Sequence, residues 1–147
     1  MRPARKVNAG WPLRVSGFRI MTVRFRQTIP VLRMFSIEKA RAFYCDYLGF
    51  TVDWEHRFAP DLPLYMSVTR GGLTLHLTEH HGDCTPGAKV FVETEDVAAL
   101  HAELSAKNYG YLRPGLEEAA WDATILTVTD PFMNRIVFNQ HHVRSKT

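Results

Sequence analysis

The fold is decided by one stretch of sequence, Ser36-Ile-Glu-Lys-Ala-Arg-Ala-Phe-Tyr-Cys-Asp-Tyr-Leu-Gly-Phe50. Ser36 is a preferred helix N-cap residue, Glu38 lies in the first turn, and Gly49 has the backbone freedom that ends a helix. Between them, apolar side chains recur every three or four residues: Ile37, Ala40, Tyr44, Tyr47 and Leu48. The stretch therefore predicts a helix with one apolar face, beginning after Ser36 and ending at Gly49.

Strand-like segments surround this helix. The Gly71-Gly72 pair and the stretch from Pro60 to Pro63 are turn signals. The predicted strands are residues 28–35 before the helix and residues 50–58, 64–69 and 73–78 after it. In the last of these, Leu73, Leu75 and Leu77 alternate with polar residues, which is typical of a half-buried strand. The first half of the chain thus reads as strand, helix and a three-stranded meander.

The second half repeats this order. Asp96 can cap a second helix, which carries Val97 on its apolar face and is expected to close at Gly110. The strands predicted around it are residues 89–93, 111–113, 124–129 and 135–139. Ile37 and Val97 are equivalent, so the copies lie 60 residues apart. The repeat predicts an α+β fold of two tandem βαβββ modules, whose curved sheets form an open barrel around a cleft.

The boundaries follow from the repeat. We expect module one in residues 28–80, a turn-rich linker in 81–87, module two in 88–140 and a short tail in 141–147. The chain of 147 residues is 46% hydrophobic and 22% charged, as expected of one globular domain. No uncharged apolar stretch of 18 residues is present, and Cys45 and Cys84 lack metal-site spacing. A cytoplasmic protein with reduced thiols is expected.

Charge divides the chain unevenly. Residues 1–27 hold seven basic residues and no acidic one, a net charge of +7, whereas the remaining 120 residues hold 11 basic and 15 acidic residues, a net charge of −4. The basic signal therefore belongs to an N-terminal extension and not to a nucleic-acid surface on the body. This extension is interpreted as a disordered arm, or as the result of a start upstream of a natural one at Met21, in preference to an organellar presequence.

Residues 36–50 resemble the first module of the glyoxalase/bleomycin resistance/dioxygenase superfamily, also called vicinal oxygen chelate proteins. The stretch Val128-Thr-Asp-Pro-Phe-Met-Asn-Arg135 resembles the closing hairpin of that family. The resemblance runs over about residues 28–140 and implies the two-module fold. Met133 is a departure, because the family usually has glycine there to supply a positive φ.

The resemblance also implies where a divalent metal would be held. The four ligand positions fall on Ile29, Lys89, Val137 and, in the strand 73–78, His76. Isoleucine and valine have no lone pairs to give, and an ammonium group repels a cation. One histidine does not hold a catalytic metal, so neither a metal nor another cofactor is expected, and no catalytic residue is assigned.

A binding site is expected instead. The resemblance places Trp121 where bleomycin-resistance proteins have a tryptophan on the loop before the penultimate strand; those proteins are homodimers that hold a flat heteroaromatic ligand in grooves at the interface. Trp54 and Phe58 are candidates for the opposing wall, and His76 is a further candidate ligand-binding residue. Acidic residues beside Trp121 suit a cationic ligand: Glu117, Glu118 and Asp122. The structural alternative is that both tryptophans only cover the barrel.

The function predicted is metal-independent binding of a planar, cationic small molecule by a homodimer, with sequestration of a bleomycin-type antibiotic as its concrete form. No nucleic-acid or membrane partner is expected. One alternative is a lyase or dioxygenase of the same superfamily that uses His76 with Glu79, His56 or Gln140. The other is a binder of an endogenous metabolite.

Overall fold

A computed structural model describes residues 22–143 of the chain. The expectations for residues 1–21, including the start at Met21, and for residues 144–147 lie outside the described residues. The elements in chain order are β1 (Val31–Arg33), α1 (Ile37–Ala40), η1 (Arg41–Tyr47), β2 (Thr51–His56), β3 (Tyr65–Arg70), β4 (Leu73–Thr78), β5 (Lys89–Glu93), α2 (Val97–Ala106), β6 (Leu116–Ala119), β7 (Ala123–Thr129) and β8 (Arg135–His141).

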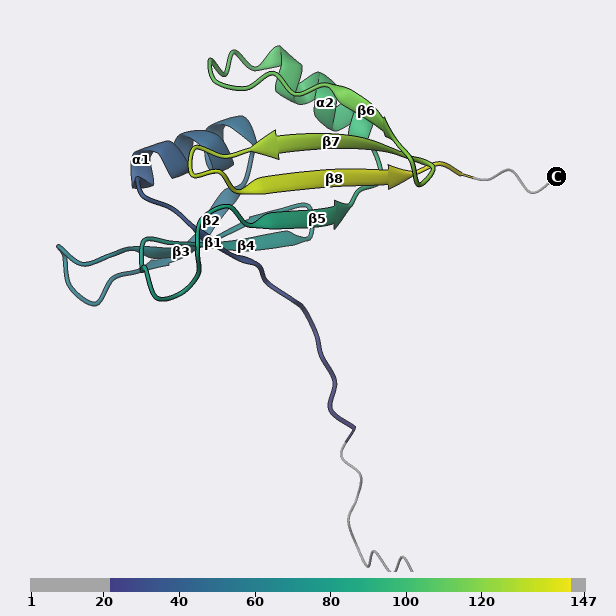
Figure 1. Cartoon of the computed structure of the whole chain (residues 1–147). Coiled ribbons are helices and arrows are strands. Elements are labelled where there is room, and N and C mark those ends of the chain that lie inside the picture. Colours follow the sequence, from purple (N-terminus) through teal and green to yellow (C-terminus); the bar gives the residue numbers. More distant parts are fainter. Residues whose placement is uncertain (1–21, 144–147) are drawn as a thin grey trace, which may run out of the picture.

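The strands form two four-stranded sheets with the same plan (Figure 1). Sheet A has the order β1-β4-β3-β2 and sheet B the order β5-β8-β7-β6. In each sheet the first strand pairs in parallel with the last, and the other neighbours are antiparallel. The helices of the two modules begin at Ile37 and Val97, so the prediction of two tandem βαβββ modules in an open α+β fold is confirmed.

The first helix runs between the predicted ends. The Ser36 hydroxyl accepts a hydrogen bond from the Lys39 amide, and Gly49 has a φ of 73°. After the first turn the helix continues with π-helical winding, in which the Leu48 amide donates to the Phe43 carbonyl five residues back. This winding still buries the side chains of Phe43, Tyr44 and Tyr47.

The second helix and the strand after it differ from expectation. Helix α2 ends at Ala106, where Lys107 turns to an extended conformation, so the expected closure at Gly110 is wrong. The predicted strand at residues 111–113 is also wrong: β6 forms only after Pro114-Gly115. Proline has no amide hydrogen for a sheet ladder and disfavours pairing on its side. The pairing with β7 therefore starts beyond it, at Leu116.

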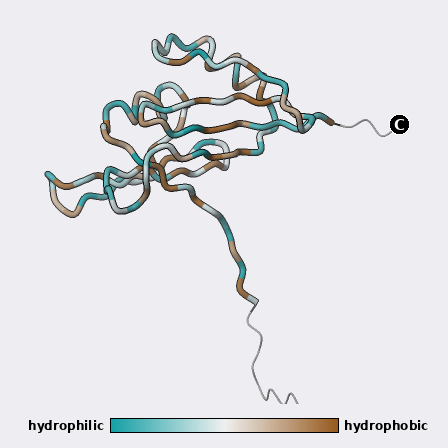
Figure 2. The backbone as a smooth tube through the Cα atoms, in the orientation of Figure 1, coloured by the Kyte–Doolittle hydropathy of each residue, from teal (hydrophilic) through white to brown (hydrophobic). Residues whose placement is uncertain are grey.

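The two modules share one hydrophobic core, to which both sheets and both helical segments contribute. Figure 2 shows hydrophobic stretches along β7 and β8, at the middle of this arrangement. The fully buried members with the largest side chains come from both modules: Tyr44, Tyr47, Phe43, Leu32, Met34, Leu48, Met66, Leu75, Leu77, Leu104, Leu126 and Ile136. The modules therefore form one folding unit and not two independent ones.

The hairpin between β7 and β8 closes this core. Asp130 is buried and accepts hydrogen bonds from the Tyr44 hydroxyl at 2.7 Å, from the Asn134 side chain at 2.8 Å and from the Phe132 and Asn134 amides, each at 2.8 Å. Burial raises the pKa of Asp130, and these hydrogen bonds oppose the rise. Met133 has a φ of 71°, so the turn keeps the left-handed backbone that glycine supplies in the resembling family.

Candidate functional site

Each sheet has one face in the shared core and one face outside it, which we call its open face. In β3 and β4 the core side chains alternate with Tyr65 and His76, which lie on the open face of sheet A together with Trp54. In β5, Val90 and Val92 pack toward the core, so Phe91 lies on the open face of sheet B. The residues predicted for binding fall on these two faces and on the loops beside them.

The open face of sheet A carries an aromatic trio of Trp54, Tyr65 and His76. The Trp54 ring stacks on the Tyr65 ring at 5.8 Å between centroids with an interplanar angle of 4°. His76 meets both rings edge-on at 5.2 Å, and its Nδ1 lies 2.8 Å from the Tyr65 hydroxyl. Burial lowers the pKa of His76, against an opposing effect of the Asp53 carboxylate, which favours the neutral imidazole. The trio is a mainly uncharged aromatic surface.

Phe58 lies at the edge of this trio. Its ring is 77% exposed and makes edge contacts with His56 at 4.8 Å and His80 at 6.2 Å. His80 is itself held by the Thr78 hydroxyl and lies 3.8 Å from the Asp83 carboxylate. The exposed Phe58 ring therefore extends the aromatic surface beyond the sheet.

Trp121 lies over the open face of sheet B in a fixed orientation. Its indole Nε1 donates a 2.8 Å hydrogen bond to Oδ1 of Asn139, and Asn139 donates through Nδ2 to Glu93 at 3.0 Å. Asn139 is fully buried, whereas Trp121 remains 50% exposed. The Phe91 ring lies 6.3 Å from the indole. The next residue, Asp122, has a φ of 62°, a conformation that aspartate tolerates better than most residues.

The acidic residues beside Trp121 converge on a histidine. His142 Nε2 lies 3.2 Å from a Glu118 oxygen, and His142 Nδ1 lies 3.1 Å from an Asp122 oxygen. His141 Nε2 lies 3.4 Å from Glu93 on the neighbouring part of the face. An imidazole therefore lies beside each of these three carboxylates.

The positions that hold a metal in the resembling family do not fit one here. Ile29 and Val137 offer aliphatic side chains, Lys89 is an exposed ammonium, and His76 is bonded to Tyr65. No group of three or more His, Cys, Asp or Glu side chains in residues 22–143 is placed to hold a metal ion.

The residues that the lyase or dioxygenase alternative pairs with His76 make structural contacts instead. Glu79 accepts from the Leu64 amide, and Gln140 accepts from the Val97 amide at the start of α2. His56 packs on the Phe58 ring. Because Glu79 and Gln140 accept hydrogen bonds from these backbone amides, neither joins His76 as a metal ligand.

The predicted site residues form two sets. Trp54, Phe58 and His76 gather on sheet A, while Trp121, Glu118 and Asp122 gather on sheet B, and no ring contact joins the sets within the described part of the chain. Three residues were missed by the sequence analysis: Tyr65, Phe91 and Asn139. Strand alternation could have placed Phe91 outside the core, because it separates two core valines.

Three comparisons relate the chain to known proteins. A family model described as "glyoxalase superfamily protein" matches residues 15–144. A bleomycin-binding protein complexed with bleomycin is 21% identical with a TM-score of 0.62, covering 80% of this chain and 100% of that one. A bleomycin resistance determinant encoded on the transposon Tn5 is 21% identical with a TM-score of 0.63, covering 81% and 100%.

A further solved structure is the bleomycin-binding protein from bleomycin-producing Streptomyces verticillus complexed with copper(II)-bleomycin. It is 27% identical with a TM-score of 0.60, covering 82% of this chain and 99% of that one. No curated protein matches the chain. Within the described residues, neither helix reaches the length and hydrophobicity that a membrane span requires.

Proposed function

The chain belongs to the glyoxalase superfamily, and from this premise we propose that it binds a planar, cationic small molecule without chemical change, a bleomycin-type antibiotic being the concrete ligand. Binding of this kind protects by keeping the free ligand concentration low. Two of the similar structures, bleomycin-binding proteins complexed with bleomycin and with copper(II)-bleomycin, support this ligand class.

The observation that carries the proposal is the pair of exposed aromatic surfaces. Trp54 and Trp121 are 46% and 50% exposed, and each is held by a neighbour, the first by stacking on Tyr65 and the second by its bond to Asn139. Large aromatic faces held in one orientation lose little side-chain entropy when a flat ligand stacks on them. Such surfaces suit binding better than they suit covering a core.

We propose that a second copy completes the groove. Within one chain the two aromatic surfaces lie on separate sheets, so a ligand between two ring walls needs one wall from each chain. Strands β1 and β5 are edge strands with one unpaired side each, which pairing or packing with another copy would cover. The homodimer is therefore part of the proposed function.

A cationic ligand agrees with the charges on sheet B. Glu93, Glu118 and Asp122 lie around Trp121, and residues 28–147 carry a net charge of −4. A cation beside an indole face and a carboxylate gains from both the ring quadrupole and the opposite charge. Binding would need no metal held by the protein, because the four family ligand positions do not supply a donor set.

The test is a fluorescence titration of the full chain with metal-free and copper-loaded bleomycin. We expect saturable quenching of tryptophan emission with both forms, reduced in Trp121→Phe and in Trp54→Phe. Trp11→Phe is the matched control for the remaining indole and should leave the affinity unchanged. Light scattering at micromolar concentration should give the dimer mass, and elemental analysis should find no stoichiometric divalent metal. A monomeric protein whose tryptophan emission is not quenched by either form of bleomycin would overturn the proposal.

A further inference from the structure

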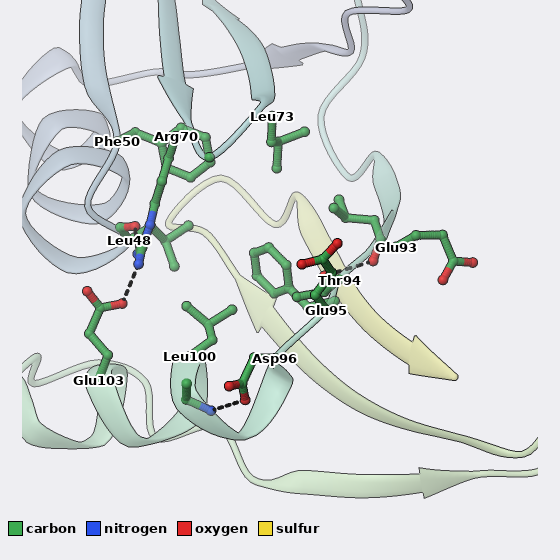
Figure 3. A pocket seen from close by; sticks show the side chains of 14 residues that line it. Leu48, Phe50, Arg70, Leu73, Glu93, Thr94, Glu95, Asp96, Leu100 and Glu103 are labelled. Atoms are coloured by element: carbon green, nitrogen blue, oxygen red, sulfur yellow. Dashed lines mark hydrogen bonds and ion pairs between the residues drawn. The ribbon is translucent and has the colours of Figure 1, made fainter. Parts of the chain in front are cut away.

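A cavity of about 730 Å³ lies between the modules (Figure 3). Of the residues proposed for ligand binding it shares only Glu93. It is bounded by the Gly71 turn between β3 and β4 on one side and by the first turns of α2 on the other. Its apolar part combines Phe50 and Leu73 of module one with Leu100 and Phe138 of module two. The cavity is therefore wide enough for a side chain or peptide that contacts both modules.

The charged part of the lining is strongly acidic. Four carboxylates and one guanidinium line the cavity, a net charge of −3: Glu93, Glu95, Asp96, Glu103 and Arg70. The guanidinium is already used, because it pairs with Glu103 at 2.7 Å and donates to the Leu48 carbonyl. Asp96 caps α2 through the Ala99 amide. Glu95 is exposed and has no partner within residues 22–143, so negative charge remains uncompensated.

We propose that residues 1–21 of the basic N-terminal segment, residues 1–27, bind in this cavity of their own chain. Residues 1–21 hold five basic residues and no acidic one, a net charge of +5, which is complementary to the acidic lining. They also contain Trp11 and Phe18, which match the apolar part. The same chain thus holds both a cavity with excess negative charge and a tethered segment with excess positive charge. This inference does not depend on the proposed antibiotic binding.

The path of the chain brings the segment to the end of the molecule where the cavity lies. Strands β1 and β4 are parallel, with Val31 opposite His76 and the Pro30 carbonyl bonded to the His76 amide. The chain upstream of Val31 therefore runs toward the start of β4, which is Leu73, a lining residue of the cavity. A tether of this kind gives a local concentration in the millimolar range.

The chain before the described residues is long enough to fold back to the cavity. Residues 22–28 are exposed and run away from both sheets (Figure 1). Twenty-one residues precede them, and an extended chain of that length spans up to about 70 Å. That reach is sufficient for the charged residues upstream to come back to the module junction.

The experiment uses carbodiimide coupling, which joins a lysine amine to a carboxylate it touches. Lys6 is the one lysine of residues 1–27, and Arg14→Lys and Arg19→Lys add two probes without changing the charge. In the full chain at low salt we expect at least one of the three lysines to couple to Glu95 or Asp96. The yield should fall between about 0.05 and 0.5 M NaCl, because screening shortens the range of attraction.

A mixture of ¹⁵N-labelled and unlabelled protein identifies the docking partner. Coupled peptides that carry one isotope only show binding within a chain, and mixed pairs would show binding to a second copy and overturn the proposal. Glu95→Gln should lower the coupling to Asp96 by about two- to fivefold, the effect of one exposed ion pair, whereas Asp46→Asn, on the exposed side of η1, should not. Equal coupling to carboxylates all over the body, or no effect of Glu95→Gln, would also overturn it.

Discussion

The two sides of the sheets are built in opposite ways. On the core side, contacts cross between modules, as when Tyr44 of the first helix bonds to Asp130 of the last hairpin, 86 residues away. On the open side, the main contacts stay within one module, as in the stacking of Trp54 on Tyr65 and the bond from Trp121 to Asn139. The comparison indicates that stability comes from the shared side, which leaves the other side free to expose large aromatic rings.

The largest effect is expected from removing a buried hydrogen-bond acceptor on the core side of the sheets. Asp130→Ala leaves the buried Tyr44 hydroxyl and the Asn134 side chain without their acceptor, so it should lower the free energy of unfolding by about 2–4 kcal/mol. Asp53→Ala is the matched change on the open side, where the carboxylate accepts from Ser67 and Thr69, and it should cost about 1 kcal/mol. Urea unfolding of both variants measures the difference. Equal losses would contradict the contrast between the two sides.

The next effect concerns the open side and depends on the proposed function. Trp121→Ala should weaken bleomycin binding by about 1–3 kcal/mol, roughly 5- to 150-fold in Kd, and Trp121→Phe should recover part of the loss. The folded state should lose only about 1 kcal/mol, because half of the side chain is exposed and one hydrogen bond is removed.

Titrations and melting curves of the two Trp121 variants separate the binding role from a structural one. An alanine variant that loses about 3–5 kcal/mol of stability yet binds normally when folded would assign Trp121 to structure instead of binding.

A smaller effect is expected at the turn of the closing hairpin. Met133 holds a positive φ, which costs a side-chain-bearing residue free energy that glycine does not lose. Met133→Gly should therefore raise the free energy of unfolding by about 1 kcal/mol. Met133→Ala keeps the strain and serves as the control; it should not stabilise. If both variants behave alike in thermal unfolding, the backbone conformation is not the cause.

The smallest effect is a pH dependence from the open face of sheet A. Burial lowers the pKa of His76 in the folded state, so the unfolded chain binds the proton more readily. The stabilising contribution is complete above about pH 6.5, the ordinary histidine value, and is lost as the pH falls through the lower folded-state value. His76→Asn should show a weaker loss of stability between pH 7 and pH 5 than the unaltered protein. An identical pH dependence would show that His76 does not cause it.

Local signals explain how much of the fold the sequence predicts. The caps at Ser36 and Asp96 and the turn at Gly71-Gly72 act through neighbouring residues, so the helix starts and the bounds of β4 were predicted correctly. Strand β6 was missed because its four residues, Leu-Glu-Glu-Ala, have weak strand propensity and form a strand through pairing with β7. The end of α2 was likewise predicted too far along the chain, at Gly110 instead of Ala106.

The candidate site depended on less local information. Trp121 was found through resemblance, whereas the trio on sheet A depends on strand register. The pairing of β2 with β3 shifts between Val52 and Trp54. Simple alternation would put Trp54 on the same side as Val52, which packs against the core, but the shift moves the indole to the open face beside Tyr65. A bulge of this kind leaves no clear mark in the sequence.

The closing hairpin also governs how the chain can fold during synthesis. Asn134 donates to the Arg33 carbonyl at 2.8 Å across 101 residues of sequence, so the hairpin supplies a partner to the first strand as well as to the first helix. The ribosome delivers module one long before residues 130–134 emerge, and until then the Tyr44 hydroxyl lacks its acceptor. The first half therefore completes its packing only when the residues of this hairpin are available.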